Sequence, residues 1–237
     1  MKPVAVFQHC NNVTPGHFAS FLDARAIPWQ LISVDQGDQV PPRIDDFSGL
    51  CFMGGPMSVN DDLGWIEQEC ALIRNAVSAN MPVIGHCLGG QLMSRALGGT
   101  VGRNPVPEIG WGRVSIENEQ VARTWLGECK GFEAYHWHGE TFSLPQGAQR
   151  ILRSRFCENQ AFVLGPHLGM QFHVEMTESL IRNWNEEWSA TFDASTETSP
   201  SVQPTAQQLV RMAESLPVMR NVADRLYAKW VQGLLVG

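Results

Sequence analysis

Hydrophobic residues in the first hundred positions follow two alternating patterns. Short, largely apolar runs are typical of strands in a covered parallel sheet, and they occur at 4–7, 30–34, 48–55 and 81–85. Between them, apolar residues recur at steps of three and four, which predicts helices over 17–26, 64–79 and 88–97. Because parallel strands need crossover connections, this alternation predicts an α/β fold with a mostly parallel sheet covered on both faces.

The pattern changes between Gly98 and Gly169, where Gly and Pro are frequent and apolar segments are short and alternating. Such segments predict antiparallel hairpins added to the edge of the sheet, with strands over 113–117, 133–138, 150–153 and 161–165. A further buried strand is predicted over 168–175, where the residues are again largely apolar.

The C-terminal part predicts helices and a polar connection. Residues 177–188 have a helical pattern after a capping threonine, and 193–204 are small, polar and Pro-containing, as in a loop. Residues 205–235 predict two helices broken near Pro217. We therefore expect one domain over 1–190, with 191–237 forming a linker and a helical extension packed on that same domain.

Composition excludes several classes of function. The 237-residue chain has 43% hydrophobic and 17% charged residues and a net charge of −7, which excludes a disordered chain and a broad nucleic-acid surface. No apolar run approaches the roughly 20 residues of a membrane span, and the first run is too short for a secretory signal. The six cysteines form no CxxC pair, so reduced thiols and a cytoplasmic location are expected.

The segment Gly85-His86-Cys87-Leu88-Gly89-Gly90-Gln91 lies between a predicted strand and a predicted helix. A nucleophile on such a sharp turn needs small neighbours, and glycines stand two positions to either side of Cys87. The helix N-terminus would bring positive potential and free N–H groups to the sulfur, which favours a thiolate and can receive an oxyanion.

A thiolate nucleophile needs a base, and the base needs a group that orients it. His173 lies near the C-terminal end of a predicted strand, and Glu175 follows two positions later. Alternate residues of a strand point to the same side, so the carboxylate can hold one ring nitrogen while the other faces the sulfur. Alone this pair is also compatible with a solvated surface pair.

Taken together, G-x-C-x-G-x-Q at 85–91 and Q-F-H-x-E at 171–175 resemble the class I glutamine amidotransferase domain, in particular that of GMP synthases. The segments Gly54-Gly55-Pro56-Met57-Ser58 and Trp137-His138-Gly139-Glu140 agree with further motifs of that family. The resemblance covers about residues 4–185 and implies a flavodoxin-like, doubly wound α/β fold with added antiparallel hairpins.

The resemblance also implies roles for particular residues. Cys87 would be the nucleophile, His173 the general base and acid, and Glu175 the orienting carboxylate. Amides of Gly55 and Leu88 would form the oxyanion hole. The glutamine pocket would be formed by Gln91, Glu108, His138 and Gly139. The implied reaction cleaves a γ-carboxamide through a γ-glutamyl thioester, with no cofactor and with ammonia or an amine released.

Departures from the family pattern leave the substrate open. Val174 stands where the family usually has Pro, and Glu140 where Asp is common, which indicates a divergent subgroup. No synthetase domain follows within this sequence, so an ammonia-using reaction would need a separate partner synthase. Free glutamine, a γ-glutamyl peptide and another γ-glutamyl amide all remain possible substrates.

Three other interpretations compete with this one. GHCLGG also resembles the nucleophile turn of dienelactone hydrolases, although that family places an Asp between the nucleophile and the His. A non-catalytic, partner-binding subunit would be expected to have lost a triad residue, and none is lost. His136 and His138 alternate along a predicted strand like a metal pair, but the sequence offers no third ligand at a suitable spacing, so no metal site is predicted.

Overall fold

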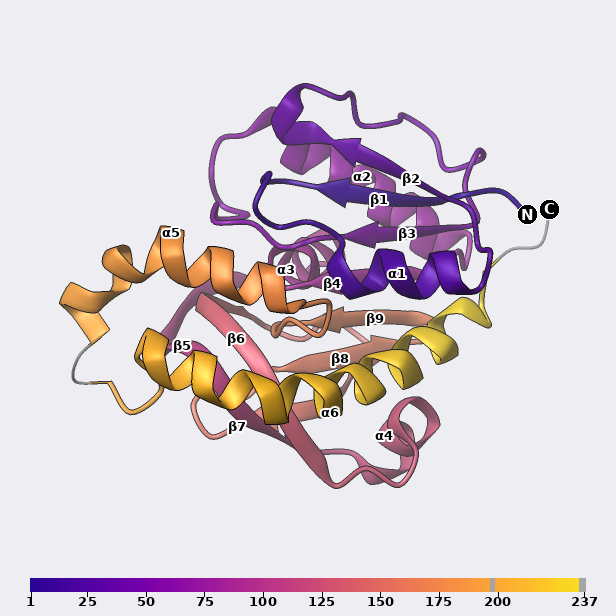
Figure 1. The fold of residues 1–237 in the computed structure, drawn as a ribbon. Helices are drawn as coiled ribbons and strands as arrows, with labels where there is room; N and C mark the ends of the chain where they lie inside the picture. Colours follow the sequence, from indigo (N-terminus) through magenta and orange to yellow (C-terminus); the bar gives the residue numbers. More distant parts are fainter. Residues whose placement is uncertain (197–198, 235–237) are drawn as a thin grey trace.

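The computed structural model describes residues 1–196 and 199–234, and a single mixed sheet organises them. The strands are β1 (Val4–Gln8), β2 (Trp29–Ser33), β3 (Gly49–Phe52), β4 (Val83–His86), β5 (Val101–Ile116), β6 (Gly131–Phe142), β7 (Gln149–Ser154), β8 (Ala161–Leu164) and β9 (His167–Met170). Their order across the sheet is β2-β1-β3-β4-β9-β8-β7-β5-β6 (Figure 1).

The half of the sheet from β2 to β9 is parallel. Its order is that of a flavodoxin-like doubly wound sheet, in which the chain reverses its direction of winding beside β1. Every residue of β1, β3, β4 and β9 is buried, which explains why the sequence of these strands is largely apolar. The predicted fold class is confirmed.

The other half of the sheet is antiparallel. β8 pairs with β9 and β7, and the long strand β5 pairs with both β7 and β6. A register shift between Arg103 and Glu108 interrupts the β5–β6 ladder, and on its far side Glu108 lies directly opposite His138. The predicted hairpins are therefore present, and they extend the sheet beyond β9.

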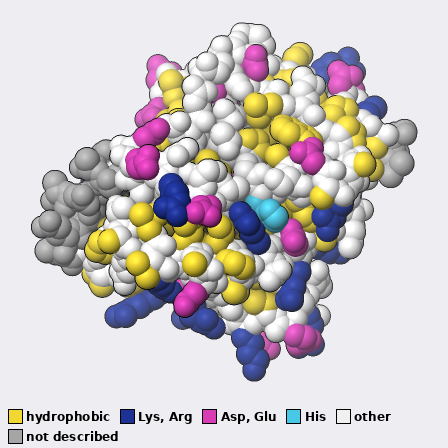
Figure 2. Space-filling view, viewed as in Figure 1, with side chains coloured by type: hydrophobic (Ala, Val, Ile, Leu, Met, Phe, Trp, Pro, Cys, Tyr) yellow, Lys and Arg dark blue, Asp and Glu magenta, His cyan; other side chains and the backbone are white. Residues whose placement is uncertain are grey.

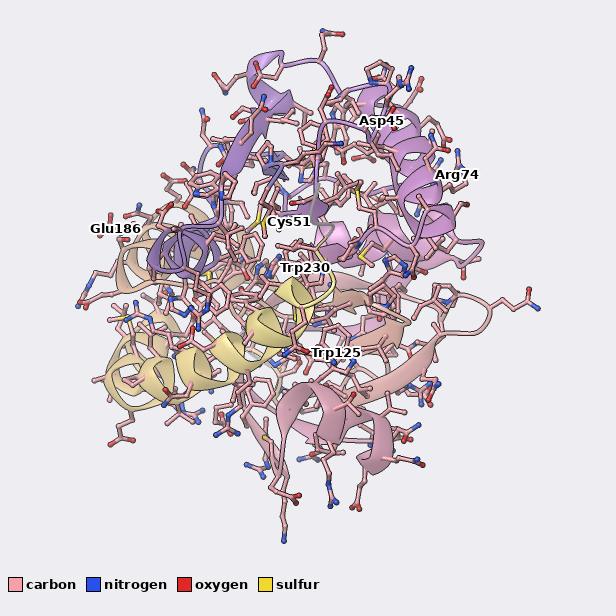
Figure 3. All side chains as sticks on the ribbon, turned by 90° about the vertical axis from the view of Figure 1, so that its right-hand side faces the viewer. Asp45, Cys51, Arg74, Trp125, Glu186 and Trp230 are labelled. Atoms are coloured by element: carbon pink, nitrogen blue, oxygen red, sulfur yellow. The ribbon has the colours of Figure 1, made fainter. Side chains whose placement is uncertain are left out.

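Helices cover both faces of the sheet. They are α1 (Gly16–Ala24), α2 (Gly64–Ser78), α3 (Leu88–Ala96), α4 (Glu119–Leu126), α5 (Glu178–Thr196) and α6 (Thr205–Val231), with a 3-10 turn at Val34–Gln36. α2 and α3 lie behind the sheet in Figure 1, and α1, α5 and α6 lie in front. Trp230, near the end of α6, is buried against the ring of Phe18 of α1, with 5.7 Å between ring centroids (Figure 3).

Three predicted elements differ from the structure. The strand expected over 168–175 ends at Met170, because His173 leaves the β9 ladder and donates its backbone N–H to Tyr135 O at 2.8 Å. The residues after Met170 remain buried, and burial alone produced the strand-like pattern.

The break expected near Pro217 is also absent, and α6 is one helix that includes this proline. Pro217 is exposed, as is Ala213, whose carbonyl loses its helical partner and can face water instead. Leu216 and Met219 beside it remain in the core, which holds the helix together. Of the loop expected over 193–204, residues up to Thr196 belong to α5, and 197–198 lie outside the described residues.

Charges of both signs are mixed on one face of the molecule. Basic and acidic side chains are interspersed among hydrophobic ones on the face seen in Figure 2. Within 1–196 and 199–234, no helix is both long and apolar enough to cross a membrane.

Candidate active site

Cys87 occupies a strained turn between β4 and α3. Its backbone has φ +50° and ψ −106°, a region that non-glycine residues rarely adopt. The Cys87 N–H donates to Met170 O at 2.9 Å, which ties the turn to β9, and the side chain is 6% exposed. Strain of this kind is found where a nucleophile must project from a strand-to-helix turn, as the sequence predicts.

The glycines around Cys87 allow α3 to approach the sheet closely. A side chain at Gly89 would overlap the carbonyl of Phe52 in β3, and one at Gly85 would overlap the backbone of Gly89 itself. The first N–H groups of α3 have no partner within the helix, so the turn presents amide donors beside the sulfur.

His173 is held in one orientation by its neighbours. Its Nδ1 lies 2.6 Å from Glu175 Oε1, and both side chains are buried. The indole of Trp184 packs edge-to-face with the imidazole, with 4.8 Å between ring centroids and 88° between planes. Because Nδ1 is engaged by the carboxylate, Nε2 is the ring nitrogen left for the cavity side.

The charges of this pair stabilise one another. Burial lowers the pKa of His173, but the Glu175 carboxylate and the Cys87 sulfur outweigh burial and raise the pKa to about 10. Burial raises the pKa of Glu175, and the nearby His173 outweighs it, so the pKa of this carboxyl is lowered. The site therefore favours an imidazolium beside an ionised carboxylate at neutral pH.

Cys87 and His173, 86 residues apart in the sequence, converge at Gly54. A Cβ placed on Gly54 would lie 2.8 Å from His173 Cε1 and 3.6 Å from Cys87 Cβ. Gln171 Nε2 lies 3.6 Å from Cys87 Sγ, and Gln171 Oε1 accepts from Gln91 Nε2 at 3.2 Å. The sulfur therefore lies close to both an imidazole and a side-chain amide.

A cavity of about 530 Å³ opens at these side chains. Cys87 and His173 line it, and so do the predicted pocket residues Gln91, His138 and Gly139 and the predicted oxyanion residue Gly55. Three indoles, those of Trp137, Trp184 and Trp188, contribute an apolar wall. The lining also contains Val13, Pro56, Met57, Ser58, Asp61 and Glu140.

Glu108 was expected in this pocket, but it is not among the residues that line the cavity. As the cross-strand partner of His138 it lies behind that residue, where its oxygens accept from Ser154 Oγ and Gln160 Nε2, both at 2.7 Å. Burial raises the pKa of Glu108, but His138 and His136 outweigh burial and leave it lowered. Leu88 does not line the cavity either. Its predicted contribution to the oxyanion hole involves only its backbone N–H, at the start of α3.

Comparison with known proteins shows the family of the chain. The family model of class-I glutamine amidotransferases matches residues 24–183. The chain belongs to the class-I glutamine amidotransferase family. The predicted family and class of enzyme are thereby confirmed, and the dienelactone hydrolase interpretation is set aside.

Individual relatives extend over most of the fold. A crystal structure of a glutamine amidotransferase from Methylobacillus flagellatus has a TM-score of 0.97 and 42% identity, covering 100% of this chain and 97% of that one. A glutamine-hydrolyzing GMP synthase subunit of Ignicoccus hospitalis is 31% identical over 57% of this chain and 71% of its own length. Gamma-glutamyl peptidase 3 of Arabidopsis thaliana is 26% identical over 69% of both chains.

The sequence patterns did not predict a buried His9–Glu69 pair that packs behind the loop at residues 54–58. His9 Nε2 lies 2.9 Å from Glu69 Oε2, and His9 Nδ1 lies 3.3 Å from Gly54 O. Burial lowers the pKa of His9, but Glu69 outweighs burial, so the net shift is upward. Through the contact of His9 with Gly54 O, the pair holds the loop in place. Its members are 60 residues apart and belong to no motif, so only the tertiary structure shows it.

Proposed function

We propose that this protein hydrolyses the γ-carboxamide of glutamine or of a related γ-glutamyl compound, with Cys87 as nucleophile, His173 as acid and base, and Glu175 as the carboxylate that orients it. The observation that carries the proposal is the meeting of the Cys87 and His173 side chains at Gly54, on the wall of one cavity. A thiol, an imidazole and a carboxylate in this order of contacts form the arrangement that acyl transfer needs.

In the first half of the proposed reaction, the Cys87 thiolate attacks the γ-carbonyl carbon and a C–S bond forms. The carbonyl oxygen becomes an oxyanion that accepts from the N–H groups of Gly55 and Leu88. The His173 imidazolium gives its proton to the leaving nitrogen, the C–N bond breaks, and ammonia or an amine departs. A γ-glutamyl thioester remains on the enzyme.

In the second half, neutral His173 takes a proton from water, whose oxygen attacks the thioester carbon. The C–S bond breaks, glutamate leaves, and the thiolate is restored beside the imidazolium. Glu175 remains ionised throughout, since its lowered pKa keeps it a carboxylate. Gln91, His138 and Gly139, which line the cavity, would contact the glutamyl part, and Glu108 would act on it through His138.

The indole wall favours a substrate with a substituted amide. Trp184 packs on both His173 and Trp188, so an apolar group on the leaving nitrogen would meet aromatic rings. A γ-glutamyl peptidase among the relatives is consistent with such a substrate. Release of ammonia to a separate synthase is the second candidate, favoured by the similarity to a GMP synthase subunit.

The location proposed for this reaction is the cytoplasm. All six cysteines are free thiols, including the proposed nucleophile, and free thiols persist in a reducing compartment.

The test compares Cys87→Ala with Cys129→Ala, which removes a thiol that does not line the cavity. Glutamate release is measured from glutamine, γ-glutamyl dipeptides and a γ-glutamyl arylamide, with and without cell extract. We expect Cys87→Ala to lose turnover on every substrate and Cys129→Ala to keep it. Unchanged turnover by Cys87→Ala would reject the nucleophile, and no turnover by wild type under any condition would favour a partner-binding subunit.

A further inference from the structure

A second cluster of chemically active side chains lies behind the cavity wall. Glu108 of β5 and His136 and His138 of β6 are all buried, and each offers a ligand atom within 4.8 Å of the others. The sequence showed only the His136-x-His138 pair. Strand pairing adds the third member, because Glu108 lies directly opposite His138 in the β5–β6 ladder.

Backbone carbonyls fix the proton on each imidazole. His138 Nδ1 lies 2.9 Å from Glu140 O, and His136 Nε2 lies 3.2 Å from Gly112 O. A carbonyl oxygen can only accept, so these ring nitrogens must be the donors. The opposite nitrogens, His138 Nε2 and His136 Nδ1, therefore carry lone pairs when the rings are neutral.

Those two nitrogens are left without hydrogen bonds. Both are buried, and neither has a hydrogen-bond partner within the described part of the chain. His138 Nε2 lies 3.2 Å from Glu108 Oε2, yet without the alignment of a hydrogen bond. One ring nitrogen of each histidine and a carboxylate oxygen of Glu108 lie within 4.8 Å of one another in one buried place, an arrangement that a shared cation would stabilise.

The surrounding contacts are those of a prepared metal site. Ligating histidines donate their other N–H to backbone carbonyls or carboxylates, and ligating carboxylates are themselves hydrogen-bonded. His136 and His138 already do the first, and Glu108 is held by Ser154 and Gln160. Each ligand is therefore oriented before any ion arrives.

We propose that Glu108, His136 and His138 bind a divalent transition-metal ion of the zinc class. Two nitrogens and one carboxylate oxygen are a ligand set that suits Zn²⁺. Tetrahedral ligands about 2.0–2.1 Å from zinc are about 3.3 Å apart. The Glu108–His138 separation of 3.2 Å already matches, and the other separations must contract from at most 4.8 Å. His138 also lines the cavity, which gives an ion a route from that side.

The test titrates the full chain, freed of metal with a chelator, against Zn²⁺ in competition with a chromophoric chelator. Cys87→Ala serves as the background, because a cavity thiolate can itself bind zinc. We expect one ion per chain, and at least about 10²-fold weaker binding in His136→Gln and Glu108→Gln. His167→Asn, which alters a buried histidine of β9 outside the cluster, is the matched control and should bind as the background does.

Substitution with Co²⁺ identifies the ligands. Visible d–d bands without a sulfur charge-transfer band, lost in His136→Gln, would support the site. Zinc that binds to wild type and to the single variant His136→Gln with Cys87 intact, but not to Cys87→Ala, would place the ion on the cavity sulfur and overturn the proposal. Absence of binding in a folded background protein, checked by thermal unfolding, would overturn it as well. Neither readout depends on the hydrolysis proposed above.

Discussion

Replacing Gly54 with alanine tests how closely the proposed base and nucleophile are packed. Gly54 does not have a positive φ, so alanine suits its backbone and only the added methyl group matters. That methyl would lie 2.8 Å from His173 Cε1, whereas carbon atoms in contact are about 3.5 Å apart or more. The imidazole must therefore retreat by about 0.7 Å.

This displacement of the imidazole is expected to slow catalysis strongly. His173 cannot rotate freely, because Glu175 binds its Nδ1 and Trp184 packs against the ring. A displacement of about 1 Å between reacting groups costs about 10²-fold, so kcat/KM should fall by about 10- to 10²-fold. Overpacking should also lower the free energy of unfolding by about 1–3 kcal/mol.

The assay is glutamate release from the best substrate of the panel, together with thermal unfolding of each variant. Gly102→Ala in β5 is the control, since a methyl group there meets nothing within 4 Å. Alkylation of Cys87, followed by mass spectrometry of its peptide, reports separately on the thiolate and should slow in Gly54→Ala. A folded Gly54→Ala enzyme with kcat/KM within about twofold of wild type would refute the packing argument.

Three further outcomes are expected. Glu175→Gln keeps the shape of the side chain but removes the charge that raises the pKa of His173. We expect kcat to fall at least about 10²-fold and the alkaline limb of the pH–rate profile to move to lower pH. An alkaline limb at the wild-type pH would contradict this role of Glu175. Burial lowers the pKa of His167 to about 4, below the value of about 6.5 in the unfolded chain. Between these two pH values only the unfolded chain binds the proton, so the free energy of unfolding decreases as the pH falls. His167→Asn should reduce the slope of the unfolding free energy against pH, measured by urea unfolding, by about 1.4 kcal/mol per pH unit. Gly89→Ala would force α3 away from the carbonyl of Phe52, so it should destabilise the fold by several kcal/mol or prevent folding. Soluble Gly89→Ala protein with wild-type thermal stability would show instead that the helix has room to move.

The sequence by itself determined the elements whose patterns are local. The largely apolar runs of β1, β3 and β4 predicted a parallel sheet because both faces of those strands are buried. The glycines around Cys87 predicted the turn, since only small residues allow a helix to begin so close to a strand. The predicted strand that ended at Met170 shows the limit of this reasoning, because a buried irregular segment has the same composition as a buried strand.

Tertiary structure decided every contact between residues distant in the chain. Periodicity describes which side of an element is buried, but it does not say which distant side chain lies opposite. The approach of His173 to Cys87, the support of Gly54 by His9 and Glu69, and the addition of Glu108 to a histidine pair all depend on how strands pair across the sheet. α6 likewise continues through a proline because packing on both sides of it outweighs one lost hydrogen bond, a balance that local propensity does not contain.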